Sequence, residues 1–471
     1  LLLLSFYSCE SWLNVTPSDR LSEEMLFNDR EGFVKALNGV YIELNTNELY
    51  GRNLTAGALD VMGQYYSVAS SSHAFYNYGG LVYTGNDEKA LFDNMWQKCY
   101  AVIACCNTII EKCDENKAGL SPVWKGSIKG EALALRAMLH FDMLRLFGPL
   151  TSELDKESIP YQTNSDQTVT PLLSGSEVVG LILDDLKNAV GLLKDTDPYF
   201  VEEEFSDTDL NYRRFRMNYF AAKGLMARVQ LWGGDKEKAA ATAKEVIAEG
   251  QAEGAEFFPF VTNSEATSSN PDRVFYSEVL FGTYHSSREK LHEDLFAPTL
   301  ESTSILTLAG TARRDDLYDN ENDYRYSVWS TYNKNGTSVL YHRKFEKQDN
   351  VTASRQYMIP LIRMSEMYLI AVECCKLDEA SVYLNTFRNA RNCNSLALTE
   401  DNRINILANE YKKEMLGEGQ LFFFYKRQEM VNIPDGNQAT GTKNVELAKY
   451  VVPLPESETD QRISSTDISN E

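Results

Sequence analysis

Two stretches of this chain can be laid over each other, and each reads as a helix, a tight turn and a second helix. The first is "LMARVQLWGGDKEKAAATAKEVI", from Leu225 to Ile247, and the second is "MYLIAVECCKLDEASVYLNTFRN", from Met367 to Asn389. In both, the second helix opens with acidic residues, which suit the positive end of a helix dipole. A small alanine follows and lets paired helices approach closely. A chain with this pattern is expected to stack helices in pairs.

Four further segments show the apolar spacing of amphipathic helices. The longest predicted helix, "IKGEALALRAMLHFDMLRLF", is followed by Gly148 and Pro149, which stop a helix. A serine cap at Ser176 begins the last of the four. The predicted helices cover residues 31–44, 90–113, 128–147 and 176–193. Together with the two pairs, they predict a mostly α fold with a tetratricopeptide-like helix-pair scaffold, whose units bury their apolar faces on their neighbours.

Two segments interrupt the helical pattern. Residues 50–89 are rich in glycine, serine and tyrosine, and residues 251–357 include short candidate strands such as "RVFYSEVLFG" and "SVLYHRKF". A structureless loop of the second length would be improbable in a compact domain. We therefore expect residues 10–471 to form a single domain. Its helical scaffold would cover about 26–250 and 358–430, with an inserted irregular mixed α/β subdomain over about 251–357.

The first residues, "LLLLSFYSCESWLN", join a short apolar run to a lone cysteine. The run is shorter than the roughly 20 apolar residues that cross a bilayer, but its composition and the small Ser8 before Cys9 are typical of a signal-peptide core. The pattern predicts that residues 1–9 are the remnant of a bacterial lipoprotein signal, with cleavage before Cys9 and lipidation of its thiol. An ordinary buried cysteine is the alternative. After Leu4 no apolar stretch approaches membrane-spanning length, so any membrane attachment is expected to be peripheral.

The balance of charge excludes some partners. With 68 acidic and 46 basic residues, the chain has a formal net charge of -22. This argues against nucleic acid as a partner, because phosphate binding needs clustered lysine and arginine. Catalysis finds no support either, since the sequence contains no HExxH, GxSxG or P-loop motif and its five histidines are too scattered to nominate a triad. We expect a protein that is not an enzyme.

The cysteines and one acidic run bear on metal binding. Cys99, Cys106 and Cys113 recur every seven residues along one helical face, where we expect small core side chains rather than metal ligands. The run "DNEND", from Asp319 to Asp323, gathers carboxylates and amides that suit calcium. Because the run lacks the EF-hand spacing and glycine, a solvated acidic loop is the favoured interpretation. No cofactor is expected, with calcium at this run as the alternative.

Four charged residues lie beside apolar positions on predicted helices. A ligand site and a set of buried ion pairs between helices are both open interpretations, and the buried pairs are favoured. The four are Glu131, Arg136, Arg363 and Glu366.

Several blocks follow one another along nearly the whole chain in the order of a known family. The most specific is "GEALALRAMLHFDMLRLFGPL". The others are "CESWLNVTP", "FVKALNGVYIEL", "MWQKCYAVIACCNTIIEK", "IPLIRMSEMYLIAVEC", "NEYKKEMLGEGQLFFFYKR" and "YVVPLPESE". Their order resembles that of the SusD/RagB family, the surface lipoproteins of Bacteroidetes nutrient-uptake systems. Leu421 and Phe424 depart from the family pattern, which has arginine and aspartate there, so the ion pairing of that block is in doubt.

The resemblance implies a function that composition does not show. It implies a non-enzymatic lipoprotein, anchored to the outer membrane and facing the cell exterior, that delivers an oligosaccharide or polysaccharide to a TonB-dependent transporter of the SusC type. The transporter barrel is generally capped by such a lipoprotein acting as a hinged lid. Peptide uptake within the same family is one alternative. A repeat scaffold that binds protein partners is another.

Aromatic residues gather in both segments that interrupt the helices. The C–H faces of sugar rings lose water well against aromatic rings, and sugar hydroxyls need a few fixed polar partners. Exposed aromatic residues in loops commonly mark binding surfaces, although such rings also fill the core of an irregular subdomain. The predicted stacking residues are Tyr65, Tyr66, Tyr76, Tyr78, Trp329 and Tyr332, and their predicted polar companions are Gln64, Asn77, Asn86 and Arg325. Trp96, Trp124 and Trp232 lie in helical patterns and are expected in the core.

Overall fold

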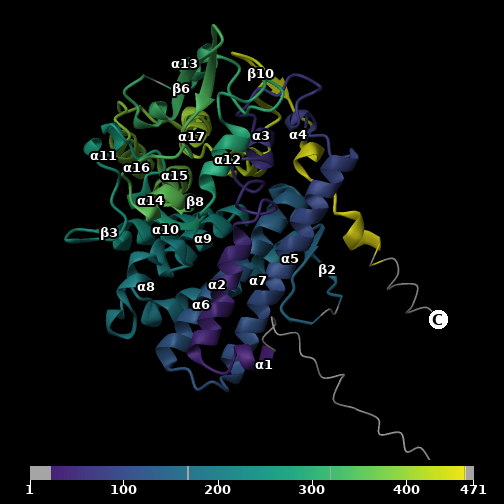
Figure 1. The fold of residues 1–471 in the computed structure, drawn as a ribbon, viewed down its shortest axis with the longest axis vertical. Coiled ribbons are helices and arrows are strands. Elements are labelled where there is room, and N and C mark those ends of the chain that lie inside the picture. Colours follow the sequence, from purple (N-terminus) through teal and green to yellow (C-terminus); the bar gives the residue numbers. More distant parts are fainter. Residues whose placement is uncertain (1–22, 167–168, 319, 461, 463–471) are drawn as a thin grey trace, which may run out of the picture.

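The structure is a computed structural model that describes residues 23–166, 169–318, 320–460 and 462. It is mostly α-helical, as the sequence predicts, and its strands pair only into small two-stranded sheets within this part of the chain. Figure 1 shows the long helices α2, α5, α6 and α7 in the lower half, and β6, β10 and α13 at the top of the molecule.

The first half of the chain supplies the long helices. These are α2 (Arg30–Leu44), α5 (Asn86–Glu115), α6 (Pro122–Phe147) and α7 (Gly175–Thr196), and the single-turn helix α1 (Glu23–Leu26) precedes them. Every residue of α6 from Gly130 to Phe147 is buried, because α2, α5, α7 and α9 (Tyr219–Trp232) surround it. A helix enclosed on all sides in this way lies in the centre of a large core, and the charged residues that it carries must find partners there.

The predicted beginning of α7 was wrong by two residues. Ser174, not Ser176, is the N-cap: its side chain accepts a hydrogen bond from the Glu177 amide, and the Glu177 carboxylate accepts one from the Ser174 amide. This reciprocal capping satisfies two amides that the first helical turn leaves unpaired.

The two superimposable stretches form the predicted helix pairs. The first pair is α9 and α10 (Lys236–Gly250), and the second is α15 (Met364–Cys374) and α16 (Leu377–Ala390). Helix α10 packs on α15, so the two pairs stack although more than a hundred residues separate them along the chain. Helices α17 (Glu400–Glu414) and α18 (Gln420–Arg427) continue the packing beside α15.

Short elements form most of the remaining described structure. The short helices are α3 (Ala58–Met62), α4 (Tyr76–Gly79), α8 (Asp207–Asn211), α11 (Asn263–Thr267), α12 (Arg288–Leu295), α13 (Thr311–Leu317) and α14 (Ala353–Tyr357). The 3-10 turns are η2 (Thr151–Glu153), η3 (Glu202–Glu204), η4 (Arg213–Phe215), η5 (Tyr276–Glu278), η6 (Tyr324–Val328) and η7 (Leu447–Tyr450). The strands are β1 (Glu157–Pro160), β2 (Leu172–Ser174), β3 (Gln251–Ala252), β4 (Ala255–Glu256), β5 (Val279–Tyr284), β6 (Trp329–Lys334), β7 (Thr337–His342), β8 (Met358–Arg363), β9 (Asn432–Pro434) and β10 (Thr442–Asn444).

Three antiparallel strand pairs lie in or beside residues 251–357, and the shortest of them joins β3 to β4. Strands β6 and β7 form a hairpin whose turn, Asn335-Gly336, has positive φ angles of 53° and 88°, as tight hairpins require. Strand β5 pairs with β8, which leads directly into α15. The β5–β8 pairing therefore joins this irregular region to the second helix pair.

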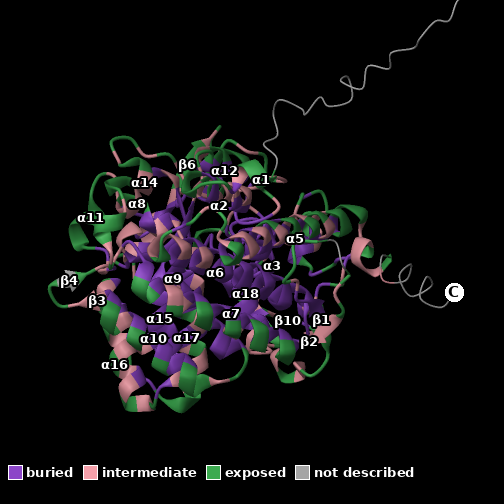
Figure 2. Ribbon diagram, turned by 90° about the horizontal axis from the view of Figure 1, so that it is seen from below, coloured by how far each residue is buried: buried purple, intermediate pink, exposed green. Residues whose placement is uncertain are grey.

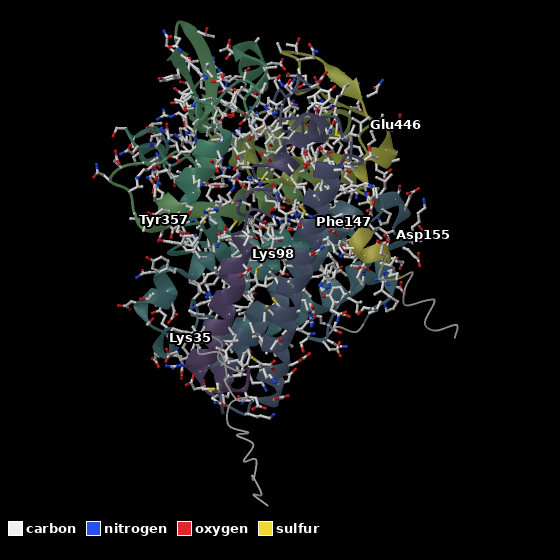
Figure 3. All side chains as sticks on the ribbon, turned by 45° about the vertical axis from the view of Figure 1, so that its right-hand side comes forward. Lys35, Lys98, Phe147, Asp155, Tyr357 and Glu446 are labelled. Carbon is white, nitrogen blue, oxygen red and sulfur yellow. The ribbon has the colours of Figure 1, made fainter. Side chains whose placement is uncertain are left out.

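The buried side chains form one continuous core that runs through the helices (Figure 2). Cys99, Cys106 and Cys113 are fully buried on α5, which confirms that they are core residues. Phe147, at the end of α6, packs its ring edge-on against Trp96 of α5, with ring centroids 5.0 Å apart (Figure 3). Trp96 and Trp232 are buried as predicted, whereas Trp124 is only partly buried.

The four charged residues singled out on the helices form buried ion pairs, as predicted. Each pair joins two elements that are distant in the sequence. The pairs are Arg136–Asp185, Glu131–Arg213, Glu366–Arg228 and Arg363–Glu418. Removing either partner from such a pair leaves a charge in an interior that solvates it poorly. These contacts therefore stabilise the fold rather than bind a ligand.

Leu421 and Phe424 occupy the two positions where the resemblance led us to doubt an ion pair. Both side chains are buried, and the Phe424 ring stacks on Tyr411 with centroids 4.5 Å apart. Apolar packing therefore holds α18 to α17 at this point. Nearby, Arg427 pairs with Glu373.

Within the part of the chain that the structure describes, no helix is both long enough and apolar enough to cross a membrane.

Candidate functional site

Two of the predicted stacking residues present their rings to solvent. The side chain of Tyr76, at the start of α4, is 43% exposed, and that of Tyr332, on β6, is 44% exposed. Tyrosines with this exposure leave a ring face and a hydroxyl available to a ligand. These two residues remain candidates for sugar stacking.

The segments that carry Tyr76 and Tyr332 are both tied to one loop, residues 299–308. Ahead of Tyr76, the amide of Ala74 donates to the carbonyl of Thr303 at 3.2 Å. Beyond Tyr332, Lys334 Nζ donates to the carbonyl of Leu300 at 2.9 Å. Both exposed tyrosines therefore flank the same loop in the upper half of the molecule (Figure 1).

Tyr66, Tyr78 and Trp329 are buried, which corrects the expectation that they meet a ligand. The Tyr66 hydroxyl donates to Asp60 at 3.3 Å, and Trp329 Nε1 donates to the Tyr318 hydroxyl at the same distance. A ring enclosed on both faces has no surface on which a sugar can stack. These rings fill the interior of the irregular segments, the alternative that the sequence left open for them.

Arg325 is also a structural residue rather than a polar companion. Its guanidinium is buried and makes ion pairs with Asp323, Glu410 and Glu414 at 2.7, 2.9 and 3.2 Å. With its donors directed to three carboxylates, Arg325 anchors η6 to α17. The expectation that it meets a sugar hydroxyl is corrected on this ground.

The other polar companions lie at three different places. Asn77 is partly buried and donates to Glu88 Oε1 at 3.2 Å. Asn86 is exposed at the start of α5, where it lines a cavity of about 540 Å³ together with Tyr83, Phe92 and residues 452–456. Gln64 donates through Nε2 to three backbone carbonyls, including that of Gly79 at 3.1 Å.

Gln64 and Tyr65 both line a second cavity, of about 280 Å³, which we call the α13–α17 cavity. It is lined also by Leu308, Arg313, Asp316, Leu317, Asn409, Lys412, Leu421, Pro434, Gly441 and Thr442. Tyr65 forms part of the wall, but it is only 3% exposed and its hydroxyl donates to the Tyr411 carbonyl at 3.2 Å, so the expectation that its ring stacks on a sugar is corrected as for Tyr66. Of the predicted residues, only these two share this cavity.

The sequence interpretation missed the two cations of this cavity, Arg313 and Lys412. Both lie outside the aromatic clusters on which the prediction of a ligand site depended. The available signal was their spacing, since Arg313 and Asp316 lie three residues apart on α13, and Asn409 and Lys412 lie three apart on α17. That spacing puts each pair on one helical face, but it does not show that the two faces meet.

The calcium and lipid predictions fall partly or wholly outside the described residues. Cys9 lies outside them, as does Asp319 of the acidic run. Asp323, at the other end of that run, has both carboxylate oxygens bound by Arg325. Among the described residues, no three His, Cys, Asp or Glu side chains come together as a metal site would require.

The stacked helix pairs and the irregular region between α10 and α15 define the class as a mostly α protein of tetratricopeptide-like architecture. Two family models match this chain: a SusD-like model described as "Starch-binding associating with outer membrane" over residues 11–231, and the SusD family model over residues 272–463. The chain belongs to the SusD/RagB family.

Individual relatives resemble the chain along nearly its whole length. SusD-like protein P2 of Formosa agariphila is 22% identical and aligns with 96% of this chain and 95% of its own. A SusD-like carbohydrate binding protein from Bacteroides vulgatus matches with a TM-score of 0.70 and 20% identity, over 92% of this chain and 96% of its own. A laminarin binding SusD-like protein matches with a TM-score of 0.66 and 17% identity, over 92% and 97%. At these identities, the solved structures establish the fold.

Proposed function

We propose that this protein binds a glycan at the cell surface and delivers it to a TonB-dependent outer-membrane transporter of the SusC type, without catalysing a reaction. Family membership supports the proposal, as do relatives described as binding carbohydrate and laminarin. The observation that carries it is the pair of half-exposed tyrosines, Tyr76 and Tyr332, held on segments bonded to the loop 299–308. In this proposal, residues 251–357 are an insert that supplies part of the ligand surface to the helical scaffold.

Replacing Tyr76 and Tyr332 by alanine is expected to weaken glycan binding by about 1–3 kcal/mol for each ring that stacks on a sugar. The measurement is calorimetry or retarded migration in gels with laminarin and starch as the first probes. Tyr212→Ala is the matched control, because Tyr212 is 38% exposed but lies next to α8, in the opposite half of the molecule. Unchanged affinity in both folded tyrosine variants would reject the stacking assignment, and release of reducing ends would reject the non-enzymatic one.

We also propose that the protein is held at the outer membrane by lipid on Cys9. The apolar residues before Cys9 and the description of the family as associating with the outer membrane support this. Labelled fatty acid supplied to cells is expected to enter the wild-type protein and to be absent from Cys9→Ser. Equal labelling of the two proteins would contradict the anchor.

A further inference from the structure

The α13–α17 cavity contains two cations that lack carboxylate partners. Arg313 of α13 is only 8% exposed, and Lys412 of α17 is partly buried. Within the described chain, neither side chain has an ion pair or a hydrogen bond. The other buried arginines near α17 differ sharply, since Arg325, Arg363 and Arg391 each bind at least two carboxylates.

Two unpaired cations are unusual in a chain with a formal net charge of -22. Acidic side chains are abundant, yet none lies within ion-pair distance of Arg313 or Lys412 among the described residues. Burying a charge without a partner is costly, because the protein interior solvates it poorly. An anion that entered the cavity would offset this cost.

The titration of Lys412 agrees with this geometry. Burial, together with the nearby Arg313 charge, lowers the pKa of the Lys412 ammonium to about 8. Burial also lowers the pKa of Arg313. Each cation is thus held in a site that disfavours its charge, and an anion between them would remove the disadvantage for both.

The rest of the cavity has the chemistry of a sugar site. Asn409 and Asp316 offer hydrogen-bonding groups at its edge, and Gln64 has its Nε2 fixed by backbone carbonyls. Leu308, Leu317, Leu421 and Pro434 supply apolar surface of the kind that packs against C–H groups. The volume, about 280 Å³, lies near the lower limit of roughly 300 Å³ for small-molecule pockets, which suits one sugar ring rather than a long segment of chain.

We propose that the α13–α17 cavity binds one acidic sugar residue of the glycan, with its carboxylate held by Arg313 and Lys412. The inference rests on the proposed glycan-binding function and names its ligand class as glycans that contain uronic acid. The planar guanidinium matches a carboxylate with two parallel N–H donors, and the ammonium adds a point charge. The cavity is next to the loop 299–308, to which the segments carrying the exposed tyrosines are bonded. Leu308 of this loop lines the cavity, and the carbonyl of Thr307 accepts a hydrogen bond from the Ser67 amide at 2.8 Å.

Asp316 has a distinct part in this proposal. It is exposed on α13, lines the same cavity and lies close enough to Lys412 and Arg313 to act on their charges, but it makes no ion pair with either. A carboxylate at this place repels an acidic ligand. Its removal should therefore strengthen the binding of an acidic ligand.

The test is calorimetry of the full chain with a trimer of galacturonic acid, compared with a neutral laminarin trimer. Arg313→Gln and Lys412→Gln are each expected to reduce affinity for the acidic trimer by about 10-fold to 100-fold, the usual effect of losing a hydrogen bond to a charged group. Asp316→Asn should increase it. Lys194→Gln, at an exposed lysine near the end of α7, is the charge-matched control and should change nothing.

The pH dependence supplies a second measurement. Wild-type affinity for the acidic trimer should fall as the pH rises above about 8, because Lys412 then loses its proton. The dependence should be absent from Lys412→Gln. The other charged groups that act on Lys412 are Arg313, Asp316 and Lys413, and those near Arg313 include Tyr425 and Asp435. The carboxylate of the trimer does not titrate in this range.

The possible outcomes separate the two proposals. Binding of the neutral trimer with none of the acidic one would overturn this inference and leave the proposed function standing, whereas binding of no glycan at all would overturn both. A response to galactose 6-sulfate but not to galacturonate would overturn the carboxylate assignment. The unfolding midpoints of Arg313→Gln and Lys412→Gln are expected to be equal to or higher than that of the wild type, because removing an unpaired cation breaks no ion pair and relieves the cost of burying its charge. A lowered midpoint with unchanged affinity would overturn the inference by giving the cations a structural role.

Discussion

Replacement of Glu414 by glutamine should lower the free energy of unfolding by about 3–5 kcal/mol, the usual cost of breaking a buried ion pair by removing one partner. Glu414 lies at the end of α17, fully enclosed, and accepts from Arg325, Arg363 and Arg391. One carboxylate thus serves three guanidiniums. Glutamine keeps the size of the side chain but removes the charge and one acceptor, leaving the three cations close together in a poorly solvating interior.

Urea unfolding followed by circular dichroism measures this effect. Glu400→Gln is the control, since Glu400 begins the same helix, and its carboxylate, 69% exposed, pairs with Arg403. Exposed pairs contribute about 0–1 kcal/mol, so this variant should unfold almost as the wild type does. A loss below about 1 kcal/mol in Glu414→Gln would show that the three arginines find water or other carboxylates, and that the network is not held by Glu414.

The ion pairs around Glu414 also connect α17 to the region that carries the candidate site. Arg391 links Glu414 to Glu278 beside β5, and Arg325 links it to η6, just ahead of the β6–β7 hairpin that carries Tyr332. The irregular region and α17 are therefore joined by charge pairs rather than by a shared apolar face alone. Loss of Glu414 should loosen the region that carries Tyr332 before it affects the long helices.

Replacement of Asp60 by alanine should lower the free energy of unfolding by about 2–5 kcal/mol, because it leaves two buried amides without an acceptor. The Asp60 carboxylate, on α3, accepts from the Gly417 amide at 2.6 Å and from the Gly419 amide at 2.9 Å. The turn between these two glycines packs directly against the backbone of Leu54. Gly419 has a φ of 69°, and a Cβ there would lie 2.3 Å from the Leu54 carbonyl oxygen. Asp60 thus accepts the hydrogen bonds of the amides in a turn whose backbone requires glycine.

Asp60→Asn is the matched variant, and its pH dependence gives a sharper measurement. Burial raises the pKa of the Asp60 carboxyl from 3.8 to about 7. Between those values the folded protein holds a proton that the unfolded chain has lost, so the contribution of Asp60 to stability is present at low pH and is lost as the pH rises through about 7. Asparagine does not titrate. The stability of the wild type relative to Asp60→Asn should therefore fall between about pH 4 and pH 7 and level off above that, and a constant difference would contradict the raised pKa.

The local spacing of apolar residues in the sequence was sufficient to predict most of the long helices. The apolar spacing of residues 31–44, 90–113 and 128–147 predicted α2, α5 and α6, because a helix face is written in residues three and four apart. The same reasoning placed the helix pairs and the buried cysteines of α5. It failed at the start of α7, where the sequence predicted Ser176 as the cap, whereas the reciprocal hydrogen bonds with Glu177 make Ser174 the cap.

The candidate site was far less predictable. Tyr66, Tyr76 and Tyr78 lie within a single glycine- and serine-rich segment, yet Tyr76 is exposed and the other two are buried. Irregular backbone has no fixed period, so nothing in the spacing of these residues shows which rings turn inward. Arg325 and Arg313 present the same difficulty. Both are buried arginines, and whether carboxylates meet them depends on helices nearly a hundred residues away.

The amino-acid sequence by itself determined the helices, their pairing into hairpins, the buried charges on those helices and the family, since each is written in short-range spacing or in the order of local blocks. The tertiary structure alone decided which aromatic rings face solvent and that Arg313 and Lys412 share a cavity in which neither forms an ion pair. The physical reason is that exposure and charge pairing depend on distances through space, which the folded chain sets between segments far apart in the sequence.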